Sequence, residues 1–156
     1  MTEYRGSRDA DGNATVIVVN DDGRRRPLRH FARHSPSGFE WGFAGSGPAD
    51  LARSILAHHL GGRVAPPARV YQLFKCTVVA GLPKGEWRLT SDDIASWLQH
   101  ELRSIGVNCP RCADQGALWP EQRMSRRPGN RAEHCDCEAG RVLSEIPANL
   151  QIAKKQ

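Results

Sequence analysis

Residues 86–105 read EWRLTSDDIASWLQHELRSI and contain the strongest structural signal in the chain. Trp87 and Leu89 alternate with charged residues, which predicts a short strand with one buried face. Thr90 precedes Asp93 by three positions, and this capping-box spacing predicts that a helix begins here. Apolar residues then recur every three or four positions, at Ile94, Trp97, Leu98, Leu102 and Ile105. The stretch therefore predicts a strand and then an amphipathic helix that ends at Gly106.

The segments before this stretch predict a hairpin and a first helix. Ala14–Val19 is β-branched and apolar, and the turn residues Asn20–Gly23 follow it, so we expect a β-hairpin that returns through residues 27–30. Phe39–Phe43 is interpreted as another short strand. Pro48 suits the first turn of a helix, and the apolar spacing from there to Leu60 predicts a helix over 48–60.

Residues 70–80 carry apolar side chains on both faces of an extended chain, which predicts a central strand. Cys76 within it is expected to be a small buried residue. Together these elements predict an α+β fold for residues 1–106, an antiparallel sheet with two amphipathic helices on one face. A body of about 105 residues is large enough to bury its own core.

Composition excludes several classes of protein. The chain has 156 residues and is 39% hydrophobic and 25% charged, which is typical of a globular domain and excludes collagen-like and coiled-coil proteins. No stretch approaches the roughly 20 apolar residues that span a bilayer. Five cysteines without an apolar leader point to a reducing cytoplasm rather than to a secreted disulfide framework. The net charge of +5 is spread along the chain. A net charge of this size bears on solubility and association and does not by itself indicate a function.

The C-terminal third contains two closely spaced cysteine pairs. Cys109 and Cys112 form a Cys-x-x-Cys pair, and Cys135 and Cys137 form a Cys-x-Cys pair after 22 intervening residues. Four thiolates satisfy tetrahedral Zn²⁺, and the adjacent His134 is an alternative ligand for one of them. Four protein ligands leave no open position for water, so we predict structural zinc in a small zinc-ribbon-like appendage over 107–141, followed by a tail over 142–156.

Arginines lie in and between the cysteine pairs and are candidate contacts to nucleic acid or to a protein partner. Their guanidinium groups suit phosphate, although acidic neighbours leave a solvated surface loop as the alternative. These candidate contacts are Arg111, Arg123, Arg126, Arg127 and Arg131.

Residues 30–52, HFARHSPSGFEWGFAGSGPADLA, resemble the signature of an uncharacterised family, a domain of unknown function found in bacterial, plasmid and phage proteins. The resemblance extends over about residues 4–102 and includes the 71–79 segment and Trp87. It implies an accessory or mobile-element context and transfers no activity. The cysteine segment lies outside the shared body, so the zinc prediction rests on cysteine spacing alone.

The same stretch offers the parts of a ligand pocket at the Ser35–Asp50 corner. A glycine-rich loop that enters a helix N-terminus can bind an anion, and a histidine beside a serine can serve catalysis. The candidate residues are His34, Ser35, Glu40, Trp41, Gly45, Ser46 and Gly47. A purely structural strand-turn-helix corner is the competing interpretation, and we favour it because no Walker lysine follows and no carboxylate can be assigned to orient the histidine.

The sequence therefore supports two hypotheses of different kinds. The first is a non-enzymatic, zinc-binding accessory protein of a phage or mobile element that binds nucleic acid or a nucleic-acid-handling protein, with inhibition of host machinery or of defence as one form. The alternative is an enzyme or binding protein for a phosphorylated or nucleotide-like ligand at the Ser35–Asp50 corner. Whether the protein is an enzyme is left open, and the non-enzymatic interpretation is favoured.

Overall fold

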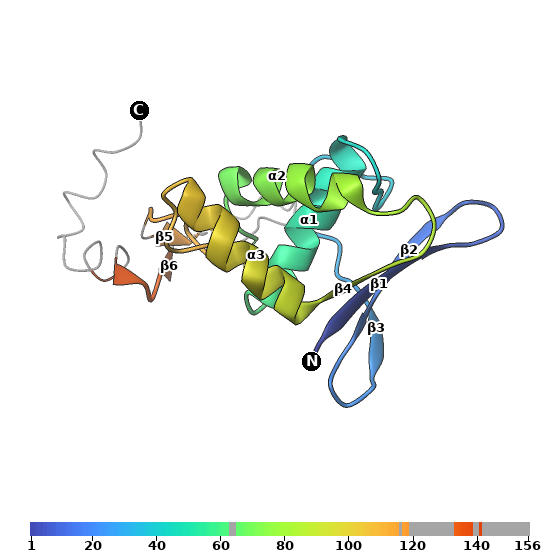
Figure 1. Ribbon diagram of the computed structural model, residues 1–156, viewed down its shortest axis with the longest axis horizontal. Coiled ribbons are helices and arrows are strands. Elements are labelled where there is room, and N and C mark those ends of the chain that lie inside the picture. Colours follow the sequence, from blue (N-terminus) through green and yellow to red (C-terminus); the bar gives the residue numbers. More distant parts are fainter. Residues whose placement is uncertain (63–64, 116, 119–132, 139–140, 142–156) are drawn as a thin grey trace, which may run out of the picture.

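An antiparallel sheet lies at one end of the molecule, and helices pack against one of its faces (Figure 1). The computed structural model describes residues 1–62, 65–115, 117–118, 133–138 and 141. In this part of the chain the sheet has four strands, β1 (Glu3–Arg8), β2 (Ala14–Val19), β3 (Arg25–Pro27) and β4 (Trp87–Thr90). The three α-helices of the same residues are α1 (Ser46–His59), α2 (Ala68–Thr77) and α3 (Ser91–Ser104). The predicted α+β class is confirmed, with three helices in place of two.

The sheet has the strand order β3-β2-β1-β4, with every pair antiparallel. The predicted hairpin is formed by β2 and β3, and the predicted strand around Trp87 is β4. Strand β1 was not expected, because its core-facing positions are Tyr4 and Gly6 rather than a run of aliphatic residues. Gly6 is required there, since a Cβ at this position would lie 2.2 Å from the Trp87 indole.

Helix α1 runs through the centre of the fold and is buried from Gly47 to Ala57. It contacts α2, α3 and the short 3-10 turn η1 (Val79–Gly81). The helix begins two residues before the predicted Pro48 and ends at His59. Gly47 lets the preceding loop approach closely, because a Cβ there would lie 2.6 Å from the Cβ of Glu40.

Two of the predicted strands are wrong. Residues 70–80 were expected to form a central strand, but Ala68–Thr77 is helix α2. Val70, Tyr71 and Phe74 lie on one helical face and are buried against the core, whereas Cys76 faces solvent and is not the buried residue we expected. The segment 39–43 is irregular, and Gly42 has a φ of +81°, which interrupts an extended strand.

The predicted capping box and the amphipathic helix α3 are confirmed. The Thr90 hydroxyl accepts a hydrogen bond from the Asp93 amide at 3.1 Å, and the Asp93 carboxylate accepts one from the Thr90 amide at 2.9 Å. Trp97 on the buried face of α3 packs edge-on against Phe74 of α2. Its indole N–H donates to the Thr77 hydroxyl at 2.8 Å, so α2 and α3 are joined by apolar and polar contacts.

The core continues past α3 into the cysteine segment. Val107 and Ala113 are nearly inaccessible and belong to the same hydrophobic cluster as the helices and the sheet. The first cysteine pair, which lies between them in sequence, is therefore held against the body. None of the helices in the described ranges combines the length and the apolar character that crossing a bilayer requires.

Candidate metal centre

The four cysteines of the two pairs come together at the end of α3. Their sulfur atoms all lie within 4.8 Å of one another, with 3.7 Å between Cys109 Sγ and Cys135 Sγ and 3.5 Å between Cys112 Sγ and Cys137 Sγ. Four sulfurs bound to one zinc at the usual Zn–S distance of about 2.3 Å would be roughly 3.8 Å apart in a tetrahedron. The cluster therefore has the size of a four-thiolate metal site.

A tight turn positions the first pair. The Ala113 amide donates to the Cys109 carbonyl at 2.8 Å, and the Gln115 amide donates to the Cys112 carbonyl at 3.1 Å. Ala113 and Asp114 both adopt positive φ, 50° and 63°, so the backbone reverses within one turn. Both thiols consequently project from the same side of the turn toward the second pair.

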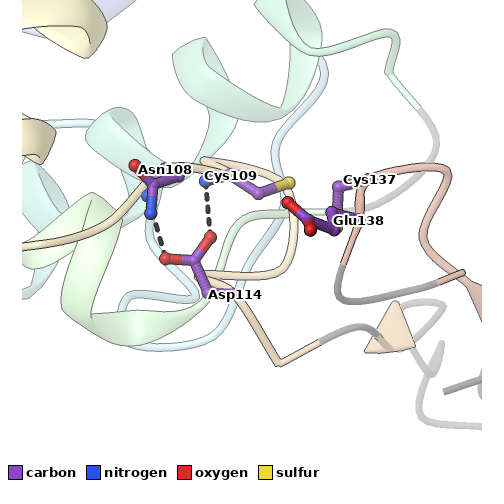
Figure 2. Close-up of a pocket in the computed structure, with 5 residues that line it drawn as sticks. All are labelled: Asn108, Cys109, Asp114, Cys137 and Glu138. Carbon is purple, nitrogen blue, oxygen red and sulfur yellow. Dashed lines mark hydrogen bonds between the residues drawn. The ribbon is translucent and has the colours of Figure 1, made fainter. Parts of the chain in front are cut away.

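Asp114 holds this turn closed. Its carboxylate accepts hydrogen bonds from the backbone amides of Asn108 at 2.9 Å and Cys109 at 2.7 Å (Figure 2). A carboxylate that accepts two amide hydrogen bonds fixes the backbone on which Cys109 sits. Outer hydrogen bonds of this kind orient metal ligands.

The second pair follows a short strand. β5 (Ala117–Leu118) and β6 (Glu133–His134) form a two-stranded antiparallel ribbon, and Cys135 comes directly after β6. The Arg141 amide donates to the Cys137 carbonyl at 3.0 Å. Arg111 from the first turn and Asp136 from the second form an ion pair, which joins the two halves beside the sulfurs.

Burial shapes the chemistry of the thiols. Cys112 and Cys135 are almost fully buried, and burial raises the pKa of the Cys135 thiol far above its usual value. Four clustered thiols in this environment ionise together only if a cation compensates their charge. A bound divalent ion supplies that compensation, and four sulfur ligands complete its coordination without a solvent position. The four cysteines are thus positioned to hold a metal ion.

A cavity of about 380 Å³ borders the cluster and is lined by Asn108, Cys109, Asp114, Cys137 and Glu138. Figure 2 shows these lining residues, with the Cys109 side chain directed toward Cys137 and Glu138. Near the sulfurs, the described charged residues include the acidic Asp114, Asp136 and Glu138 and the basic Arg111, which pairs with Asp136.

The other residues predicted around the metal fall into two groups. Arg111 is engaged with Asp136, so its charge is partly neutralised. Arg123, Arg126, Arg127 and Arg131 lie outside the described residues, as does the side chain of His134. Their predicted roles therefore stay predictions.

The second candidate site, the Ser35–Asp50 corner, is organised around a buried carboxylate. The Asp50 side chain is fully inaccessible and accepts hydrogen bonds from the backbone amides of Arg33, His34 and Ser35 and from His30 Nε2. Burial acts to raise the pKa of Asp50, but these hydrogen bonds together outweigh it and lower the pKa below the usual carboxyl range. The sequence offered no carboxylate to orient the His34 ring, and Asp50 does not orient it either, because it accepts from the His34 backbone amide while the ring contacts Tyr71. Asp50 instead anchors the loop.

The remaining corner residues are engaged with the fold. His34 Nε2 lies 2.8 Å from the Tyr71 hydroxyl, and the Ser35 hydroxyl lies 3.1 Å from that of Ser37. Trp41 is buried, and its indole N–H donates to the Gly85 carbonyl at 3.2 Å. His34 and Ser35 are therefore not paired as base and nucleophile.

The Glu40 side chain packs against the first turn of α1. Gly45 is the N-cap residue, Ser46 is exposed, and Gly47 lies against the aliphatic part of Glu40. The Glu40 carboxylate forms an ion pair with Arg8 at 2.6 Å. These contacts are made within the fold and favour the structural interpretation of the corner.

Two positioning residues of the cysteine site were missed from sequence. Asp114 and Asp136 each lie within two residues of a cysteine, and aspartate next to a tight turn commonly accepts backbone amides. The position of Asp114 beside the Cys-x-x-Cys turn could therefore have predicted its role. The pairing of Asp136 with Arg111 depends on how the two halves meet, which sequence spacing does not reveal.

Fold and site together define an α+β protein whose C-terminal segment carries a four-cysteine cluster able to hold a metal ion. Residues 4–100 match the family of unknown function DUF6166, and the chain belongs to that family. The match covers the sheet and most of the helical layer and ends before the first cysteine of the cluster. No curated protein and no solved structure matches the chain.

Proposed function

We propose that this protein is a non-enzymatic zinc-binding accessory protein whose metal orders the C-terminal segment for contact with nucleic acid or with a nucleic-acid-handling protein. The observation that carries the proposal is the convergence of four cysteine sulfurs within 4.8 Å at the end of α3. A four-thiolate site with tetrahedral spacing is the donor set that Zn²⁺ prefers in structural sites.

A structural role for the metal follows from the surrounding sequence. From Asn108 to Arg141 the chain is rich in glycine, proline, arginine and cysteine and poor in large apolar residues. Beyond Ala113, which is buried in the main core, such a segment has too few apolar residues to order itself by burial. Structural zinc contributes about 10 kcal/mol or more of folding free energy in small domains. The metal therefore substitutes for a hydrophobic core in this part of the chain.

The partner class is inferred from charge and context. The chain carries a net charge of +5, and the segment between the cysteine pairs contains Arg123, Arg126, Arg127 and Arg131. These groups suit phosphate or an acidic protein surface. The resemblance of the 30–52 stretch to bacterial, plasmid and phage proteins favours an accessory role in a phage or mobile element, in the reducing cytoplasm that free thiols require.

Native mass spectrometry with elemental analysis tests the metal. The full chain is purified without added metal, and we expect one zinc per chain and loss of C-terminal order when a chelator removes it. A chain that carries iron, or no metal, contradicts the zinc assignment. Binding to labelled DNA and RNA, measured against salt concentration, tests the partner, and absence of salt-dependent binding by the zinc-loaded protein would exclude nucleic acid.

A further inference from the structure

The face of the sheet that points away from the helices is uncovered by any described part of the chain (Figure 1). Strand alternation places one set of side chains on this outer face. Three of them are arginines and one is a glutamate. The set comprises Glu3, Arg5, Ser7, Thr15, Ile17, Val19, Arg25, Pro27, Arg88 and Thr90.

Two of these arginines face each other across the strands. Arg5 of β1 lies directly opposite Arg88 of β4 in the sheet register. Like charges in directly opposite positions destabilise a sheet, so this pair carries an energetic cost that the fold does not require. The side chains are accessible, at 43% for Arg5 and 58% for Arg88.

The Glu3 carboxylate forms ion pairs with both arginines. Glu3 accepts from Arg5 at 2.7 Å and lies 3.5 Å from the Arg88 guanidinium. The hydrogen bond from Arg5 is the main reason why the pKa of Glu3 is lowered. Besides the hydrogen bonds from Thr90, the charge of Arg88 contributes to the lowered pKa of Asp93 at the start of α3, so the two arginines are only partly balanced by Glu3 and a smaller positive excess remains at this place.

Arg25 adds a further positive charge on the same face. It is exposed on the edge strand β3 and makes no ion pair within the described part of the chain. The nearby Asp21 and Asp22 are engaged with the N-terminal amine and with Arg24. The register places Arg25 opposite Val19 and thus two strands and two residues from Arg5, about 12 Å between Cα atoms.

We propose that the outer face of the sheet binds the phosphate backbone of double-stranded DNA through Arg5, Arg88 and Arg25. The inference deepens the proposed function and rests on its nucleic-acid-binding part. It adds a contact on the body of the protein to the one proposed for the cysteine segment.

Two features favour duplex DNA over other occupants. The outer face carries no aromatic ring among the described residues, so it lacks the stacking surface with which proteins usually hold single strands. The Cα atoms of Arg5 and Arg25 are separated by about the same distance as the roughly 12 Å width of the major groove. Their side chains can therefore reach phosphates on both DNA strands. A second copy of the same face is disfavoured, because two-fold pairing would bring arginine against arginine.

The test is a salt titration of binding to a fluorescently labelled DNA duplex, measured by anisotropy with the full-length, metal-loaded chain. The three phosphate contacts of this face contribute about −2.7 to the slope of log K against log salt. The variant R5Q/R88Q should reduce the magnitude of the slope by about 2, and R25Q should reduce it by about 1. R25Q removes no ion pair described in the structure, so it tests the face without disturbing Glu3.

The matched control is R69Q/R103Q, which removes the same charge from exposed positions on α2 and α3. It should keep the wild-type slope, and thermal unfolding of every variant verifies the fold. If the wild-type protein binds and the face variants bind as the control does, the face assignment is wrong and the proposed function stands. If the wild-type protein binds no nucleic acid, the face assignment and the nucleic-acid part of the proposed function both fail, and the protein-partner part remains. Equal binding of a polyglutamate peptide would show general recognition of negative charge and would overturn the assignment to DNA.

Discussion

The carboxylate of Asp50 accepts a 2.9 Å hydrogen bond from the backbone amide of Ser35, and by this contact the central helix holds the loop before it. Replacing Asp50 with asparagine keeps the shape but removes the charge, and an amide nitrogen cannot accept from the backbone. We expect Asp50→Asn to lower the free energy of unfolding by about 2 kcal/mol or more. Urea unfolding measures it, with the exposed Asp92→Asn as the control. An unchanged midpoint would show that the loop does not depend on this charge.

The lowered pKa of Asp50 also predicts how the stability of the fold changes at low pH. Although burial opposes it, the amides of Ser35, Arg33 and His34 and the ring of His30 hold the pKa of Asp50 below its usual 3.8. A lowered carboxyl pKa stabilises the fold above the unfolded value and is lost as pH falls through the folded value. The stability difference between wild type and Asp50→Asn should therefore be constant above pH 5 and shrink below about pH 4. Denaturant midpoints measured at several pH values test this.

Mild acid acts through two histidines at the end of α1. Burial, together with the charge of Arg26, lowers the pKa of His58, and burial, together with His58, lowers that of His59, from the usual 6.5. The unfolded chain thus takes up protons first, and stability falls as pH drops below 6.5 toward the folded values. His59→Gln should flatten this decline, whereas His100→Gln, at an exposed position on α3, should not. A decline that is equally steep in all three proteins would contradict the assignment.

The cysteine cluster predicts a sharp contrast between two conservative substitutions. Cys112 is fully buried among the four sulfurs, whereas Cys76 is exposed on α2. Cys112→Ser should weaken metal binding by more than the roughly 10–100-fold that loss of an outer hydrogen bond costs, and should lower the unfolding temperature. Cys76→Ser should bind one equivalent with wild-type affinity. Competition with a chromogenic chelator measures both.

Asp114 offers a test of the turn without removing a ligand. Asp114→Asn weakens the hydrogen bonds to the amides of Asn108 and Cys109 and should reduce metal affinity by about tenfold. Glu138→Gln removes a carboxylate from the same cavity without touching the turn and is the control. If both variants lose affinity equally, the negative charge near the metal matters and the turn does not.

The sequence predicted local patterns well and failed where distant contacts decide. The capping-box spacing of Thr90 and Asp93 and the spacing within each cysteine pair are local signals. They predicted the start of helix α3 and the cysteines that the structure brings together. Residues 70–80 have apolar groups in a pattern that fits a buried strand or a buried helix, and only packing against α1 and Trp97 selects the helix.

Strand β1 was missed for a related reason. Gly6 is unfavourable in an isolated strand, and its value arises from the Trp87 ring that covers it across the sheet. The role of Asp50 was likewise hidden, because its partners lie 15 to 17 residues earlier in an irregular loop. Pattern reasoning does not reach such pairs.

The burial of Ala113 in the main core ties the first cysteine pair to the folding of the body. We therefore expect the turn that bears Cys109 and Cys112 to form with the body, whether or not a metal is bound. The second pair is separated from the first by 22 residues, and a bound metal would offset the entropy of closing that loop. Removal of the metal should then loosen the segment beyond Ala113 and leave the body folded.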